Sequence, residues 1–189
     1  MCFYPYIFTG HDNEFWDKVG QAIGNLQELK TIYISCARKN DDGTDVSIPD
    51  WGELARILSH VRQKIRITLT GLDPWAVGEM QALAMAIRGH PTITSFGGCY
   101  NFPYFPYECL DSLYTALAAL PALESITLTN RERRPEDEYA LANSESLTEL
   151  LRLPALRSVH FRHFSFTPAL CQGTANALTE GTVITAIKS

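Results

Sequence analysis

The chain has 189 residues, of which 46% are hydrophobic and 20% charged, so it is long and apolar enough to fold around a core. Its net charge of −5 argues against a nucleic-acid partner bound through a broad basic face. No apolar run is long enough to span a bilayer, the start has no signal-peptide pattern, and the five cysteines include no CxxC pair. These features predict an intracellular protein without a membrane partner, a disulfide framework or a zinc site.

Helices and strands are predicted to alternate along the chain, beginning with a strand over Tyr4–Thr9 that has Tyr6 at its centre. The helices are marked by apolar residues at three- and four-residue spacing. In chain order these residues are Phe15, Val19, Ile23 and Leu26; Leu54, Ile57, Leu58 and Val61; Met80, Leu83, Ala84 and Ile87; Leu110, Leu113, Leu117 and Leu120; and Leu147, Leu150 and Leu151. The pairs Asp73-Pro74 and Thr167-Pro168 are typical of helix starts.

The strands between these helices share one pattern, which is an apolar residue, two others, an apolar residue, one other and an apolar residue. The segments begin at Leu29, Lys64, Ile93, Leu123, Leu156 and Ile184, and their central residues are Ile32, Ile67, Phe96, Ile126, Val159 and Ile187. Three longer connections are expected, over Ala37–Pro49, Gly98–Pro106 and Arg131–Ser144. Helix-then-strand units that recur at this interval predict a solenoid.

Apolar and polar residues alternate within the predicted strands, as in Arg66-Ile-Thr-Leu-Thr70. Parallel strands that helices cover on both faces are apolar throughout, and a barrel interior needs bulky side chains. The alternation therefore predicts a parallel sheet with helices on one side and an open, mostly polar face on the other.

On these residues the chain resembles the leucine-rich-repeat family, of the ribonuclease-inhibitor type. The resemblance rests on the strand pattern and on helices that end in Leu-Pro-x-Leu, as in Ala119–Leu123 and Arg152–Leu156. The Asn or Cys that usually follows each strand in this family is matched once, by Asn101. The resemblance implies one domain over residues 1–189, with a curved parallel sheet on the concave side and helices on the convex side. It also implies a non-enzymatic scaffold whose concave face binds a protein partner.

The strand register predicts which side chains lie on the open face. The residues that we expect to bind the partner there are Tyr33, Arg66, Thr68, Thr70, Ser125, Thr127, Thr129, Ser158, His160 and Arg162. Tyr104 and Tyr107 are added because a loop rich in aromatic residues and proline follows a strand, and aromatic residues dominate interface hot spots. Serine and threonine also suit any exposed pleated surface, so each residue has a purely structural explanation as well.

The sequence contains no G-x-S-x-G, P-loop or G-x-G-x-x-G motif, and we predict no catalytic residue, cofactor or metal. His160 and His163 are three apart on a strand and would face opposite sides, which argues against a shared metal ion. Two alternatives remain open. One is an enzyme whose site gathers Cys36, Cys99, Thr129, Asn130 and His163 at the ends of parallel strands. The other is a structural segment of a larger assembly.

Neither end of the predicted repeat array carries a polar cap. The last strand, Ile184–Ser189, would leave Ile184 and Ile187 at an exposed end of the core. We therefore expect the chain to be a fragment of a longer repeat protein, or to close this end against another chain in a homo-oligomer or a larger assembly.

Overall fold

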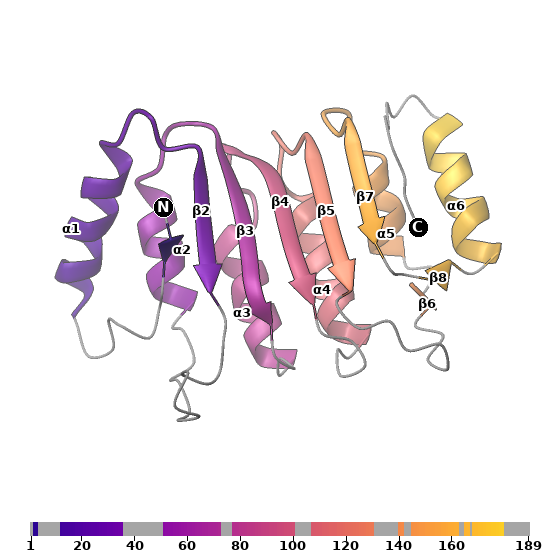
Figure 1. Cartoon of the computed structure of the whole chain (residues 1–189), viewed down its shortest axis with the longest axis horizontal. Coiled ribbons are helices and arrows are strands. Elements are labelled where there is room, and N and C mark those ends of the chain that lie inside the picture. The colour runs from indigo at the N-terminus through magenta and orange to yellow at the C-terminus, as the bar shows by residue number, and fades with distance from the viewer. Residues whose placement is uncertain are drawn as a thin grey trace.

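The protein is described here from a computed structural model, in which helices alternate with parallel strands (Figure 1). The residues that the structure describes are 2–3, 12–35, 51–72, 77–100, 107–130, 140–141, 145–162, 165–166 and 168–179. The α/β organisation predicted from the sequence is confirmed. None of the helices in these ranges is both long and apolar enough to cross a membrane.

Helices form where apolar residues recur at three- and four-residue spacing. They are α1 (Asn13–Gly24), α2 (Trp51–Ser59), α3 (Val77–Ile87), α4 (Tyr107–Ala118), α5 (Glu145–Leu151) and α6 (Pro168–Thr179). Pro168 is the first residue of α6, a position that proline favours because the backbone N–H there has no helical partner. After α3, Gly89 has a φ of 70°, a conformation that suits glycine and ends the helix.

Two parallel sheets are present in the described residues. The main one contains, in spatial order, β1 (Cys2–Phe3), β2 (Thr31–Ser35), β3 (Ile65–Leu72), β4 (Ile93–Tyr100), β5 (Ser125–Asn130) and β7 (Ser158–Arg162). The second pairs β6 (Ala140–Leu141) with β8 (Ser165–Phe166). The main-sheet strands thus lie side by side in chain order, and each is joined to the next by a crossover connection that contains a helix.

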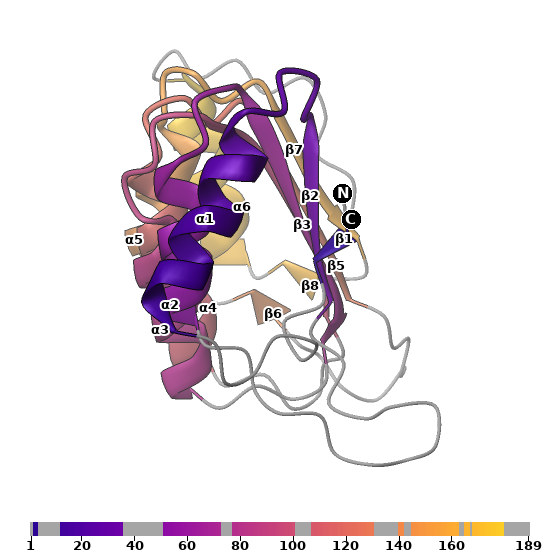
Figure 2. The same ribbon diagram turned by 90° about the vertical axis from the view of Figure 1, so that its left-hand side faces the viewer.

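The described helices lie along one side of the main sheet, and none of them covers the other side (Figure 2). The core fills the space between the two layers. Its strand residues include Ile32, Ile67, Phe96, Ile126 and Val159, which are all buried. They are the predicted central residues, and the strand register pairs them in one continuous row. Because strand side chains alternate between faces, the polar residues between them face away from the helices.

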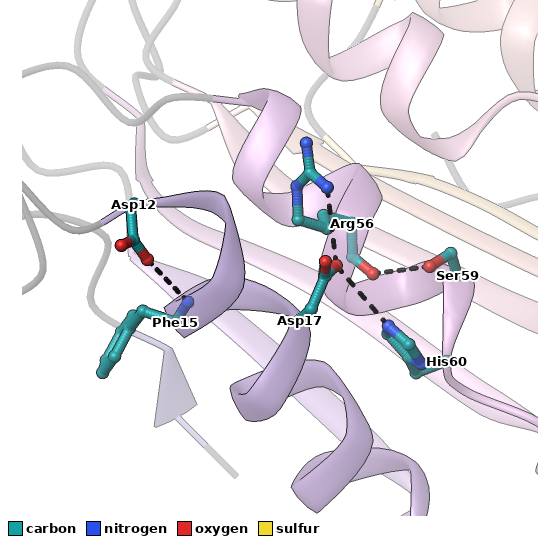
Figure 3. Close-up of polar contacts among 6 residues, drawn as sticks. All are labelled: Asp12, Phe15, Asp17, Arg56, Ser59 and His60. Atoms are coloured by element: carbon teal, nitrogen blue, oxygen red, sulfur yellow. Dashed lines mark hydrogen bonds and ion pairs between the residues drawn. The ribbon is translucent and has the colours of Figure 1, made fainter.

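Helices α1 and α2 pack closely against each other at two glycines of α1. A small polar cluster lies between them (Figure 3). Gly20 and Gly24 pack against His60, the residue that follows α2, and a side chain at either glycine would meet it. The carboxylate of Asp17 lies 3.5 Å from the guanidinium of Arg56 and 3.7 Å from His60 Nε2. Because all three side chains are partly exposed, these ion pairs contribute little to stability. The two helices can approach closely because Gly20 and Gly24 have no side chains.

Several boundaries differ from those predicted. The described part of the first strand is Cys2–Phe3, with Phe3 opposite Ile34, whereas the predicted segment Tyr4–Thr9 lies outside the described residues. Leu26 was assigned to the first helix, but α1 ends at Gly24 and the side chain of Leu26 is 49% exposed. The predicted final strand, Ile184–Ser189, also lies outside the described residues.

The register between β3 and β4 also differs from the prediction. The shared pattern aligned Ile93 with Lys64, whereas the structure pairs Ile93 with Ile65 and then Ser95 with Arg66, which leaves Thr94 as an extra residue in β4. The bulge has a physical reason. Ile65 and Ile93 are both buried, whereas the predicted alignment would have assigned Lys64 to the core face without a partner for its charge.

The long connection predicted over Arg131–Ser144 contains one further element. Ala140 and Leu141 form β6, which pairs with Ser165 and Phe166 of β8. Two residues are too few to show the alternation by which strands are recognised, so the sequence alone carries no signal for this pairing.

Candidate functional site

The open face of the sheet carries the polar rows that the sequence predicted. In the first row Thr31, Arg66, Ser95, Ser125 and Ser158 lie opposite one another on successive strands. In the second the order is Tyr33, Thr68, Gly97, Thr127 and His160. The third row contains the pairs Ser35–Thr70, Cys99–Thr129 and Thr129–Arg162. A second register shift, between Leu69 and Leu72, interrupts this last row between β3 and β4.

A hollow of about 370 Å³ lies in the middle of this face. Of the predicted binding residues, it is lined by Tyr33, Arg66, Thr68, Thr127 and Thr129, which come from three different strands. Tyr33 stands at its β2 side with 42% of its surface exposed. The open face therefore contains a hollow that is lined by one aromatic ring, one guanidinium group and several hydroxyl groups.

The other predicted binding residues either lie on the open face outside the hollow or have side chains that the structure does not describe. Ser125, Ser158, His160 and Arg162 belong to the same face but do not line the hollow. Thr70 belongs to β3, and its side chain is not described. The prediction that Tyr107 lies on a loop is wrong, because it is the first residue of α4; its side chain is not described either. Tyr104 lies outside the described residues.

Five lining residues of the hollow were not among the predicted binding residues, and two of these, Ser95 and Gly97, belong to the rows of the open face. Both stand in the predicted rows, so the strand register was the signal that identified their position. Gly97 has no side chain that could bind a partner, so its residue type gives no signal of a binding site. The effect of the missing side chain depends on residues of neighbouring strands that surround Gly97, and only the tertiary structure brings these together.

Two polar contacts connect side chains of the open face in pairs. The Nε–H of Arg66 donates a hydrogen bond to Ser95 Oγ at 3.1 Å. Ser158 Oγ and His160 Nε2 are 2.9 Å apart on the same strand. At the margin of the face, the Nζ of Lys64 lies 3.2 Å from Glu124 Oε1, so this acidic group already has a cationic neighbour.

A second hollow, of about 360 Å³, lies between α3 and α4 on the helical side. Its walls include Gln81, Met85, Arg88, Asp111 and Thr115. Ser146 of α5 donates a hydrogen bond to the carboxylate of Asp111, which ties that residue to the packing of α4 on α5.

The described part of the chain brings three residues of the alternative enzyme site together at the ends of β4 and β5, where Cys99 pairs with Thr129 and Asn130 follows. Cys36 and His163 lie outside it, and the side chains of Cys99 and Asn130 are not described. Thr129 is the one member of that set whose side chain is described, and it lines the hollow of the open face. Within the described ranges, no three His, Cys, Asp or Glu residues gather as potential metal ligands.

Comparison with known proteins adds no relative from which a function could be transferred. The chain matches no protein-family model, and no curated protein matches it either. A functional proposal for this chain therefore rests on its own residues.

Proposed function

We propose that the chain is a non-enzymatic scaffold of the leucine-rich-repeat type, whose open sheet face and adjoining loops bind a protein partner inside the cell. The solenoid part of the proposal is supported by nearest-neighbour packing. Consecutive main-sheet strands pair with one another, and consecutive helices contact one another from α1 to α6. Stacked repeats have this pattern, because each unit buries its apolar side against the next.

The binding part rests on one observation, the hollow on the open face. Tyr33 and Arg66 are residue types that anchor protein interfaces, and here both border a concave site next to hydroxyl groups. An uncovered sheet face that served only as protein surface would need neither the hollow nor an aromatic ring at its rim. The proposal excludes nucleic acid and membranes as partners and requires no cofactor or metal.

Site-specific photo-crosslinking tests this proposal. We replace Tyr33 with p-benzoylphenylalanine, a ring of related shape, and irradiate the intact chain in extract of the source cells. The matched control carries the same photo-reactive residue at Met85, which is 74% exposed on the helical side. We expect a discrete crosslinked product from position 33 that the control does not give.

A blocking variant makes the test specific for the face. The double change Thr127→Arg and His160→Glu alters the size and charge of two open-face residues, and it should abolish the crosslink from position 33. Unchanged crosslinking in this variant would count against a partner on the open face. A product from position 85 alone would move the binding site to the helices, as expected for a structural segment of a larger assembly.

The loops after the strands form the second part of the proposed surface. If Tyr104 and Tyr107 anchor the partner, alanine at either position weakens binding by roughly 1–4 kcal/mol while the melting temperature stays nearly unchanged. A large fall in melting temperature instead would assign these rings to the core.

The expected closure of the repeat end, Ile184–Ser189, against another chain is tested separately, by light scattering on the purified chain.

A further inference from the structure

The floor of the hollow on the open face is Gly97, and the fold does not require a glycine there. Gly97 lies inside β4, paired with Thr68 on one side and Thr127 on the other, and its φ is not in the left-handed region. A Cβ atom built on it would meet no atom closer than Thr68 Oγ1 at 3.7 Å, which is an ordinary contact. Glycine inside a strand lowers stability. At this position its lack of a side chain leaves the hollow open.

Arg66 supplies a positive charge to this hollow. Its Nε–H is bound to Ser95 Oγ, which orients the guanidinium group, and the two terminal nitrogens carry four further N–H donors. Within the described residues no carboxylate lies within ion-pairing distance of Arg66. The Nε side of the guanidinium group is bound to Ser95, and the terminal N–H groups can donate to the two oxygens of a carboxylate.

The helices and the main-sheet strands differ in charge, although the whole chain is acidic at −5. Helices α1 to α5 together contain eight acidic residues and two basic ones. The main-sheet strands contain no acidic residue, and their basic residues are Arg66, His160 and Arg162. An acidic partner would therefore be repelled by the helical side and attracted to the open face, which orients its approach.

We infer that the hollow over Gly97 receives an aspartate or glutamate side chain from an acidic segment of the partner protein, with Arg66 as the group that pairs with it. The inference rests on the proposed function and names the partner's chemistry. The hydroxyl groups of Thr68 and Thr127 stand beside Gly97 and can donate further hydrogen bonds to the carboxylate. Two arginines across a sheet are too few for a nucleic-acid backbone, which needs a row of phosphate contacts.

A binding assay with defined probes tests the inference. The probe is a short dye-labelled peptide of alternating glutamate and serine, and the matched peptide has glutamine in place of every glutamate. Fluorescence anisotropy on the intact chain at low ionic strength measures both affinities. We expect binding of the glutamate peptide, with NMR amide shifts centred on Gly97 and its neighbours on β3 and β5. Equal affinity for the glutamine peptide, or no binding of either, overturns the inference.

Three variants locate the effect. Arg66→Gln should weaken binding of the glutamate peptide about tenfold or more, because a charged hydrogen-bonded pair is lost. Lys18→Gln is the matched control, since it removes one positive charge from an exposed site on α1. It should change affinity by less than about twofold. Gly97→Val should abolish binding by filling the hollow while the melting temperature is maintained or raised. Equal weakening by Arg66→Gln and Lys18→Gln overturns the inference.

Three further outcomes separate this inference from nucleic-acid binding and from the proposed function. An oligothymidine that binds as tightly as the glutamate peptide, and loses affinity in Arg66→Gln, would assign the hollow to nucleic acid and overturn an acidic protein segment. If the photo-crosslink from position 33 forms equally in Arg66→Gln and the glutamate peptide does not bind, the inference fails while the proposed function stands. Absence of the crosslink together with peptide binding would reject the proposed scaffold role instead.

Discussion

Replacement of Gly24 by alanine is expected to destabilise the protein, although alanine is the better helix former. Gly24 is the last residue of α1, and a Cβ atom there would run into the backbone carbonyl oxygen of His60. A carbonyl oxygen cannot rotate away as a side chain can, so α1 must move away from α2. Overpacking of this kind typically costs about 1–3 kcal/mol. The gain in helix propensity offsets at most about 1 kcal/mol of this.

The expected net loss in the free energy of unfolding is therefore on the order of 1–2 kcal/mol. For a chain of this length that corresponds to a fall in melting temperature of roughly 2–8 °C. Gly78→Ala is the matched control, since Gly78 is in α3 and a Cβ atom there would have nothing within 4 Å. This control should be neutral or more stable by up to about 1 kcal/mol.

Urea denaturation followed by far-ultraviolet circular dichroism measures both variants against the parent chain. We expect the free energy of unfolding to fall for Gly24→Ala and to stay unchanged or rise for Gly78→Ala, although the chemical change is the same in both helices. If Gly24→Ala proves as stable as Gly78→Ala, the close approach of α1 to the end of α2 does not limit the packing, and the account of this contact is wrong.

Further predictions concern capping, the core and surface charge. Asp12→Ala should lower the free energy of unfolding by about 1 kcal/mol, since it removes the 2.9 Å hydrogen bond from the Phe15 N–H, and an unchanged urea midpoint would contradict this. Leu113→Ala should cost about 2–5 kcal/mol because Leu113 is fully buried. Met85→Ala, at a side chain that is 74% exposed, should stay within about 0.5 kcal/mol, and similar thermal melts for the two variants would refute the assigned burial. Asp17→Asn should lower stability by no more than about 1 kcal/mol, and a larger loss in denaturant titrations would show that its exposed ion pairs matter more than their geometry implies.

The sequence by itself determined the order and type of the principal elements and the face on which most strand residues lie. These features depend on local periodicity. Ile32, Ile67, Phe96, Ile126 and Val159 share one place in a repeated pattern, and the structure buries them in one row. Their polar neighbours follow on the opposite face because strand side chains alternate. The rows of the candidate surface could therefore be predicted before any strand was placed beside another.

Only the tertiary structure decided where those rows are shifted and where the surface is hollow. The bulge at Thr94 arises because Ile65 and Ile93 must both reach the core, a demand that exists only once β3 and β4 pair. The hollow over Gly97 exists because side chains from β2, β3 and β5 stand around a position without one. Such lateral neighbours are separated by about thirty residues in sequence, and no local pattern records how their volumes and charges combine.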